Sequence, residues 1–249
     1  EAKSAFLSTV SHELRTPLAS MRASAEVLLS ETLANPDEAR ELLQIVHDQI
    51  RRMSEMTNNM LESARLSSGR ARWNWQSVPI AEIGDEAVEI LTPLIDPRRV
   101  QLSLEVEPTD LTMQSDPDAI RRLILNLAGN AAKHTSDGQI KRQILPKAID
   151  SQRWIELAIT DTGFGMDEDT LGRIGEAFAS NEGGINESPT RGAGLGLSIC
   201  SRIVAAHDGR IAVASKPGEG TRIVTRLAAD LAGPVDTAEP GSIIRDVTQ

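Results

Sequence analysis

The sequence contains no tyrosine, a single cysteine and no long apolar run, and each absence excludes a class of protein. Aromatic residues make up only 2% of the 249 residues, so the core must be built from aliphatic side chains. With Cys200 alone, no disulfide framework can form within the chain, which favours a reducing compartment. No stretch approaches the roughly 18 apolar residues of a membrane-spanning helix, and no signal peptide is recognisable.

Positive charge is also in short supply. The chain has 26 Lys and Arg against 36 Asp and Glu, which gives a net charge of −10. Nucleic-acid binding and attachment to anionic membranes both depend on clustered Lys and Arg. We therefore expect no nucleic-acid partner and no membrane contact within these residues. We expect this part of the protein to be cytoplasmic, and a membrane anchor elsewhere in the full-length protein is left open.

The first quarter of the chain has the pattern of two amphipathic helices. Residues 4–30 place apolar side chains at steps of three and four, and a second such stripe follows Asn35-Pro36, an N-cap and first helical residue. Two heptad helices joined by a short loop predict an antiparallel hairpin. Each helix has a wider apolar face than one partner can cover. We therefore expect a homodimer through residues 4–66 that completes a four-helix bundle.

From residue 79 onward, helical and strand patterns alternate. Helices are expected at 80–95, 117–134, 168–177 and 195–207, and strands at 99–106, 111–115, 139–146, 153–160, 210–215 and 221–227. This order predicts an α/β sandwich, with one mixed sheet and helices on one face. The expected organisation is a helical domain over 1–68, a linker over 69–78, an α/β domain over 79–230 and a tail without regular pattern over 231–249.

One histidine stands apart from the apolar stripe of the first helix. At about 100° per residue, His12 points roughly 200° away from Val10 and Leu14, into solvent. Glu13 is adjacent and could accept the distal imidazole proton, and Thr16 lies one turn away on the same face. Pro17 removes a backbone donor and predicts a bend there. These neighbours favour a nucleophilic histidine over an idle surface residue.

Two carboxamides and an ammonium line one face of the predicted helix over 117–134. Asn126, Asn130 and Lys133 follow the i, i+4, i+7 spacing, and apolar residues cover the other side. Such groups are costly to bury unless they meet a polar ligand, and Mg²⁺ with phosphates would satisfy them. An exposed polar face explains the same pattern without a ligand.

Two glycine-rich motifs follow. Asp161-Thr162-Gly163-Phe164-Gly165 comes directly after an apolar strand, so its carboxylate could accept a hydrogen bond from an adenine amino group while the glycines allow close approach. Residues 191–197, Arg-Gly-Ala-Gly-Leu-Gly-Leu, lead into a helix, which is typical of an anion site. Each motif alone fits an ordinary tight turn equally well. Neither is a Walker loop or a dinucleotide fingerprint.

The segment around His12 resembles a known family. Residues 6–18, Phe-Leu-Ser-Thr-Val-Ser-His-Glu-Leu-Arg-Thr-Pro-Leu, are similar to the phosphoacceptor box of two-component sensor histidine kinases. The resemblance implies that His12 is autophosphorylated and that Glu13 is its general base. It also implies a phosphatase reaction that uses Glu13 and Thr16, and a response-regulator receiver domain as partner.

The order and spacing of the later motifs resemble the GHKL ATPase superfamily over residues 78–228. The resemblance implies ATP and Mg²⁺ as cofactors, with Asn130 as the metal ligand, Asn126 beside it and Lys133 on a phosphate. It implies that Asp161 contacts adenine and that Gly163 and Gly165 shape the pocket. Gly192, Gly194 and Gly196 would hinge the lid over the phosphates, Leu195 and Leu197 would also belong to the nucleotide site, and Phe178 comes just before the lid.

The sequence departs from the superfamily pattern at two places. His134 stands where an aromatic residue usually follows the box lysine, and we expect it to keep an altered contact with the nucleotide. The first aromatic residue of the phenylalanine box is missing near Ile174. Arg191 in the lid could neutralise a phosphate or remain an exposed cation.

The sequence thus predicts an ATP-dependent protein histidine kinase that passes phosphate from His12 to an aspartate of a response regulator, with phosphatase activity as well. The alternative is a nucleotide-gated signalling scaffold without kinase activity. A gyrase-type ATPase is disfavoured, because its catalytic Glu position is held by Asn126, which cannot act as a base.

Overall fold

The computed structural model describes residues 2–30, 35–67, 73–174, 195–235 and 243–246. They fall into two compact units, Glu1–Glu62 and Ser63–Gln249, which are considered separately below.

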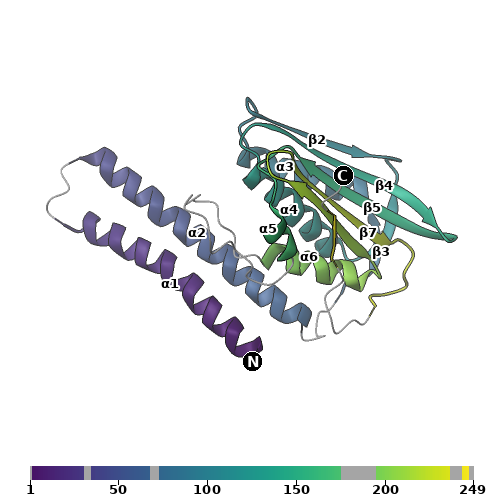
Figure 1. The fold of residues 1–249 in the computed structure, drawn as a ribbon, viewed down its shortest axis with the longest axis horizontal. Helices are drawn as coiled ribbons and strands as arrows, with labels where there is room; N and C mark the ends of the chain where they lie inside the picture. Colours follow the sequence, from purple (N-terminus) through teal and green to yellow (C-terminus); the bar gives the residue numbers. More distant parts are fainter. Residues whose placement is uncertain (1, 31–34, 68–72, 175–194, 236–242, 247–249) are drawn as a thin grey trace. The chain divides into compact units, whose positions relative to one another are not determined.

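The first unit is built from two long helices, α1 (Ala2–Leu28) and α2 (Pro36–Ser67), the latter continuing into the second unit (Figure 1). The side chain of Asn35 caps α2, because its Oδ1 accepts a hydrogen bond of 3.0 Å from the backbone N–H of Asp37. Pro17 lies inside α1 and is buried, yet α1 is one continuous helix. The predicted helical region is therefore confirmed.

The second unit contains the remaining elements. In chain order they are β1 (Gln76–Pro79), α3 (Ile80–Leu91), the 3-10 turn η1 (Thr92–Leu94), β2 (Val100–Val106), β3 (Thr112–Ser115), α4 (Pro117–His134), β4 (Gly138–Ile149), β5 (Gln152–Asp161), α5 (Glu168–Gly172), α6 (Leu195–Ala206), β6 (Arg210–Lys216), β7 (Gly220–Ala228) and β8 (Ile243–Asp246). Six strands form one mixed sheet in the order β2-β4-β5-β7-β6-β8, and β1 pairs with β3 in a separate two-stranded sheet.

Alternation along the strands separates a helix-covered face from a polar one. Helices α3, α4 and α6 cover one face of the main sheet (Figure 1). Ile144, Ile159 and Val213 are buried in one hydrophobic core with residues of these helices. The opposite face carries cross-strand ion pairs such as Arg226 Nε to Glu156 Oε2, 2.8 Å apart. This arrangement confirms the predicted α/β sandwich.

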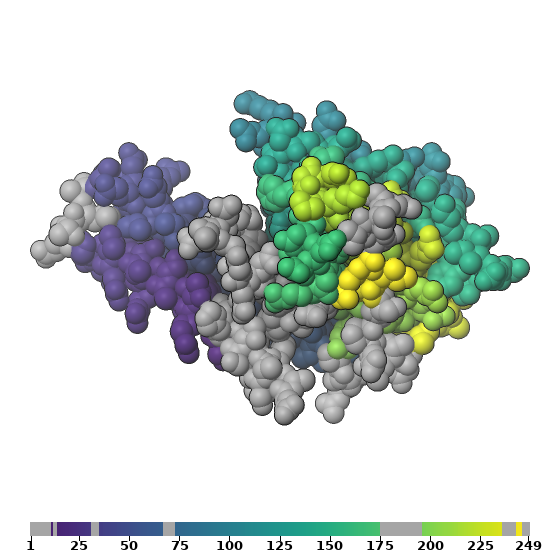
Figure 2. Space-filling model, viewed as in Figure 1, coloured from purple at the N-terminus to yellow at the C-terminus, as the bar shows by residue number. Residues whose placement is uncertain are grey.

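Two features differ from the sequence prediction. The strands at 76–79 and 112–115 pair with each other in their own small sheet, and each is followed directly by a helix, α3 or α4. The prediction that 231–249 lacks regular structure is wrong for β8, which pairs in parallel with β6. Figure 2 shows β8, in yellow, at the surface next to α5, and Arg245 Nη2 donates a 3.1 Å hydrogen bond to the carbonyl of Ile174.

Candidate functional site

Helix α4 carries the first group of predicted nucleotide residues. Its start is fixed by Asp116, whose Oδ1 accepts hydrogen bonds from the N–H groups of Asp118 (2.9 Å) and Ala119 (3.3 Å). Leu123, Ile124, Leu127 and Ala131 on its inner side are buried. Asn126 and Asn130 are partly exposed and Lys133 is exposed, so the polar stripe lies away from the core.

The side-chain amide of Asn126 is buried beside the thiol of Cys200. Among the described residues its Nδ2 has no partner of ordinary hydrogen-bond geometry, and the Cys200 sulfur is only a weak acceptor. Leaving such a donor unpaired costs about 1–3 kcal/mol. Gly196, in the first turn of α6, lies beside it, because a Cβ at Gly196 would be 3.6 Å from Asn126 Oδ1. An amide whose only neighbour is a weak acceptor, next to a helix N-terminus, suits a phosphate oxygen, so this part of the structure fits a nucleotide.

Asp161 ends β5 in a buried, structured setting. Its Oδ1 accepts hydrogen bonds from the backbone N–H groups of Gly163 (2.9 Å) and Thr221 (3.2 Å). Burial raises the pKa of this carboxyl group, and these two hydrogen bonds and nearby His134 act in the opposite direction. Both hydrogen bonds that the described residues make to the carboxylate end at Oδ1, which leaves Oδ2 for a ligand.

The turn after Asp161 needs its glycines. A Cβ at Gly163 would overlap the carbonyl oxygen of His134, and one at Gly165 would overlap that of Lys216. Gly165 also has a φ of +68°, which favours glycine. The N–H of Phe164 donates to the His134 carbonyl (3.3 Å), so the turn is bonded to the end of α4. The turn therefore holds Asp161 and the end of α4 together.

His134 occupies the C-terminal end of α4. Its ring meets the ring of Phe164 edge to face, with centroids 6.3 Å apart and planes at 83°. Desolvation by the surrounding protein lowers the pKa of His134, and the charge of Asp161 partly opposes this. The imidazole therefore lies in a partly desolvated place, within electrostatic reach of Asp161.

Several predicted residues cannot be placed. His12 and Glu13 lie within α1, but their side chains are outside the described part of the structure, whereas Thr16 is exposed. Arg191, Gly192 and Gly194, together with Phe178, lie outside the described residues. Leu195 is placed only as the first residue of α6, and Leu197 is buried in the core.

Sequence reasoning missed the contribution of the β6–β7 turn. Besides Thr221, the turn supplies Ser215, whose Oγ accepts from the N–H of Met166 (2.9 Å) and donates to the carbonyl of Gly220 (2.8 Å). A Cβ at Gly220 would overlap the backbone of Asp161. The signal for this turn is Pro-Gly-Glu-Gly-Thr over residues 217–221, which predicts a tight turn but gives no hint of its contact with Asp161.

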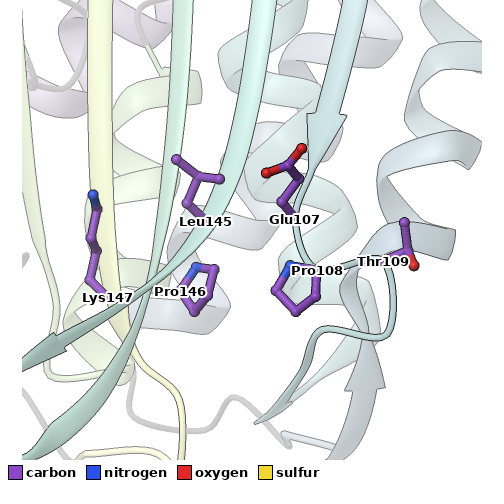
Figure 3. A pocket seen from close by; sticks show the side chains of 6 residues that line it. All are labelled: Glu107, Pro108, Thr109, Leu145, Pro146 and Lys147. Atoms are coloured by element: carbon purple, nitrogen blue, oxygen red, sulfur yellow. The ribbon is translucent and has the colours of Figure 1, made fainter.

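A surface pocket of about 640 Å³ lies elsewhere (Figure 3). It is lined by Glu107, Pro108, Thr109, Leu145, Pro146 and Lys147. These residues flank the far ends of β2 and β4, whereas Asp161 pairs with Ile140 near the start of β4. The pocket is therefore separate from the cluster around Asp161.

None of the helices in the described part of the chain combines the length and apolar character that a membrane span requires. Within the same residues, no group of three or more His, Cys, Asp and Glu side chains is placed to hold a metal ion.

Comparison with known proteins agrees with this geometry. Residues 2–69 match the His Kinase A (phospho-acceptor) domain, and residues 115–231 match the histidine kinase-, DNA gyrase B- and HSP90-like ATPase family. Sensor histidine kinase AtsR of Burkholderia thailandensis is 31% identical over 96% of this chain and 39% of its own length. Alginate biosynthesis sensor protein KinB of Pseudomonas aeruginosa is 36% identical over 90% of this chain and 37% of its own length. The chain thus spans well under half of these two relatives.

Solved structures give the same result. Full-length ShkA in complex with AMPPNP superposes with a TM-score of 0.63 at 27% identity, covering 94% of this chain and 47% of that one. The histidine kinase AdeS of Acinetobacter baumannii has a TM-score of 0.67 at 18% identity, covering 88% of this chain and 98% of that one, which shows the fold alone. With a phosphoacceptor domain followed by an ATP-binding domain, the chain belongs to the sensor histidine kinases of two-component systems and is a catalytic core of that family.

Proposed function

We propose that this chain transfers the γ-phosphate of ATP to His12 and from there to an aspartate of a response-regulator receiver domain. The observation that carries the proposal is the Asp161 cluster, a buried carboxylate with one oxygen available, in the domain that matches the ATPase family. The phosphoacceptor match over residues 2–69 includes His12. Phosphoryl transfer needs mainly positioning and charge neutralisation, which these two domains can supply together.

In this proposal, Asp161 binds the adenine amino group through Oδ2, and the ring of His134 lies beside the base. Asn126 donates its side-chain amide to a phosphate, and Lys133 adds positive charge there.

Asn130 would be the protein ligand of Mg²⁺. Mg²⁺ commonly takes one or two protein oxygens and completes its shell with phosphates and water, so an amide oxygen fits it without a carboxylate cluster. When bound, the ion would neutralise phosphate charge. The glycines at 192, 194 and 196 and Arg191 would enclose the phosphates.

Glu13 is proposed as the general base that accepts a proton from His12 as the imidazole attacks phosphorus. The same carboxylate, with Thr16, would orient a water molecule in a reverse phosphatase reaction on the regulator. Thr16 is exposed on α1, as that role requires. A hydroxyl one helical turn from the histidine lies on the same face.

The helical unit is proposed to form the homodimer interface, through residues 4–66. The phosphoacceptor family implies dimerisation, and the hairpin leaves large apolar side chains uncovered. Leu18 on α1 is exposed, and so are Leu43 and Ile50, which are seven residues apart and therefore on one face of α2. Burying these side chains against a second hairpin would remove them from water, at roughly 25 cal/mol per Å² of apolar surface. We propose domain boundaries at 68 and 79, with residues 69–78 as a linker whose last residues pair with β3 as part of β1.

The test is incubation of the chain with γ-labelled ATP and Mg²⁺, beside His12→Gln and Thr16→Ala. We expect an acid-labile, base-stable label that His12→Gln abolishes and Thr16→Ala retains, since Thr16 is assigned to the phosphatase reaction. Label that persists in His12→Gln would show a different acceptor. Tight ATP binding without any label would instead indicate the nucleotide-gated scaffold.

A further inference from the structure

Three aromatic rings meet where the linker joins the ATP-binding domain. The rings of Trp75 and His207 stack, with centroids 4.7 Å apart and planes at 30°. Trp73 meets Trp75 and His207 edge-on, at 6.2 Å and 6.4 Å. His207 directly follows α6 and is fully buried. The linker residues 73–75 are thus packed against the C-terminal end of α6.

Two hydrogen bonds fix the imidazole of His207. Its Nδ1 lies 2.7 Å from the carbonyl oxygen of Ile203, and its Nε2 lies 2.7 Å from Ser115 Oγ. Because a carbonyl oxygen can only accept, Nδ1 carries the proton, and Nε2 accepts from the Ser115 hydroxyl. Burial lowers the pKa of His207 to about 4, so the ring is neutral at pH 7. A neutral ring thus connects α6 to the end of β3.

Asp116, which follows Ser115 in the chain, connects the same linker to α4. Its Oδ1 caps α4, and its Oδ2 accepts a 2.7 Å hydrogen bond from the backbone N–H of Asn74. Trp75 Nε1 donates to the carbonyl of Leu231, also at 2.7 Å. We call Trp73, Trp75, Ser115, Asp116 and His207 the anchor cluster. It joins the linker to the start of α4 and to the end of α6.

The opposite ends of these two helices carry the nucleotide residues. Asn126, Asn130 and Lys133 lie in the second half of α4, and Gly196 in the first turn of α6 lies beside Asn126. Gly196 and His207 are eleven residues apart, which is about 16 Å along a helix. The Cys200 Sγ lies 4.0 Å from the Leu123 carbonyl oxygen, so α4 and α6 are in contact between the two ends.

We propose that His207 is a positioning residue for phosphotransfer, which couples the position of α6 at the nucleotide site to the linker at Trp73 and Trp75. This inference rests on the kinase function proposed above. A helix moves as a unit, so nucleotide binding at the start of α6 displaces or stiffens its far end. The C-terminal end of α6 contacts the linker through the stacked ring of His207, and it contacts β3 through the hydrogen bond between His207 and Ser115. The linker in turn continues from the helix pair that holds His12.

The arrangement is more specific than ordinary core packing. An apolar side chain would fill the place of His207 without needing Ser115 or the Ile203 carbonyl. The hydrogen bonds and the ring stack instead allow only a narrow range of positions for α6. Buried polar groups satisfied in this way are sensitive to small shifts of their partners, because a misaligned hydrogen bond weakens steeply.

Tryptophan fluorescence gives a direct test. The chain has three tryptophans, so Trp154→Phe leaves Trp73 and Trp75, both in the anchor cluster, as the only emitters. This protein is titrated with AMPPNP and Mg²⁺, and binding is measured independently by calorimetry. We expect the emission to change with the midpoint that calorimetry gives. Calorimetric saturation without a change in emission would overturn the coupling and leave nucleotide binding intact. Failure of AMPPNP to bind at all would overturn the kinase proposal and the coupling with it.

Kinetics separate positioning from simple folding. His207→Gln keeps a donor and an acceptor on a smaller, unstacked side chain. We expect the rate of His12 phosphorylation at saturating ATP to fall about tenfold, with the KM for ATP within about threefold of the parent protein. His207→Ala should be worse, so partial rescue by Gln distinguishes hydrogen bonding from volume. An unchanged rate in His207→Gln, or a change confined to KM, would overturn the proposal. If these variants do not fold, the fluorescence titration alone decides.

Discussion

The carbonyl oxygen of His134 occupies the space into which a side chain at Gly163 would project. The same oxygen accepts the N–H of Phe164, so the turn after Asp161 and the end of α4 are fitted to each other without spare room. Gly163→Ala should therefore push the turn away from α4 and displace Asp161.

We expect Gly163→Ala to cost roughly 1–3 kcal/mol in the free energy of unfolding and to weaken ATP binding. Gly172→Ala is the matched control, because nothing lies within 4 Å of a Cβ at Gly172. Urea unfolding and calorimetric titration of both variants would measure the two effects. Equal behaviour of the two variants would show that the contact at Gly163 is not needed.

Because the two oxygens of Asp161 have different roles, we expect Asp161→Asn to change ATP affinity without changing the stability of the fold. Asp161→Asn can keep an oxygen at Oδ1 for the N–H groups of Gly163 and Thr221, but replaces Oδ2 with a donor that repels the adenine amino group. We expect near-normal stability and ATP affinity lower by about tenfold to a hundredfold, the loss of one hydrogen bond to a charged group. Thermal melting and calorimetry measure this. An unchanged ATP affinity would show that Asp161 does not bind the adenine amino group.

The sequence predicts well what depends on local periodicity. Helix α4 follows from Asp116-Pro117 at its start and from the apolar spacing up to His134, and its observed bounds agree with the prediction. The position of Asp161 and its glycines follows from a strand that ends in a turn motif. These features depend on residues that are near one another in the chain.

Features that depend on distant partners could not be predicted. His207, before Asp208-Gly209, fits an ordinary helix C-terminus, where a cation or a Gly turn is common. In the structure it is buried against Trp75 and Ser115, which are far away in the sequence. Arg142 lies two residues from both Ile140 and Ile144, on the same face of β4, and the sequence predicts it only as part of a strand. Its burial follows from the register of β4 with β5, which places it opposite Ile159.

Arg142 predicts a stabilising substitution. Its guanidinium is fully buried, and none of its three nitrogens has a hydrogen-bond partner in the described residues. Burial lowers its pKa to about 10, and the charge of Asp85 only partly opposes this. We expect Arg142→Met to raise the free energy of unfolding by roughly 1–4 kcal/mol, since an apolar chain of similar length removes the desolvation cost.

Lys141→Met is the control for Arg142→Met. Lys141 is adjacent on the opposite face, half-exposed and 3.1 Å from Glu105 Oε2, and its loss should change stability by no more than about 1 kcal/mol. Urea unfolding with both variants measures the difference. A destabilised Arg142→Met would show that the guanidinium has a partner in solution, with Asp85 the first to examine.

His207 predicts an acid-dependent loss of stability. Its pKa is about 4 in the folded protein and about 6.5 when unfolded, so the unfolded state binds the proton more tightly. The stability that the neutral, buried His207 contributes is fully present above pH 6.5. It is lost as the pH falls towards 4, and the free energy of unfolding then decreases by about 3 kcal/mol in all. Asp116 is the nearby charge that favours protonation, and its effect is smaller than that of burial.

The comparison with His207→Gln isolates this residue, because the other titrating groups are common to both proteins. The difference in the free energy of unfolding between parent and variant should slope between pH 6.5 and 4 and be flat above that range. A difference that does not change with pH would mean that His207 titrates near its normal pKa.

Strand β8 lies beyond residue 231, where the match to the ATPase family ends, yet it covers the outer edge of β6 from Ile211 to Ala214. A shortened protein designed from the family boundary would lose it. The backbone N–H and C=O groups along that edge of β6 would then be open to the next molecule, which is the usual route to edge-to-edge aggregation. The practical domain boundary for expression and crystallisation is therefore set by strand pairing, at residue 246 or later.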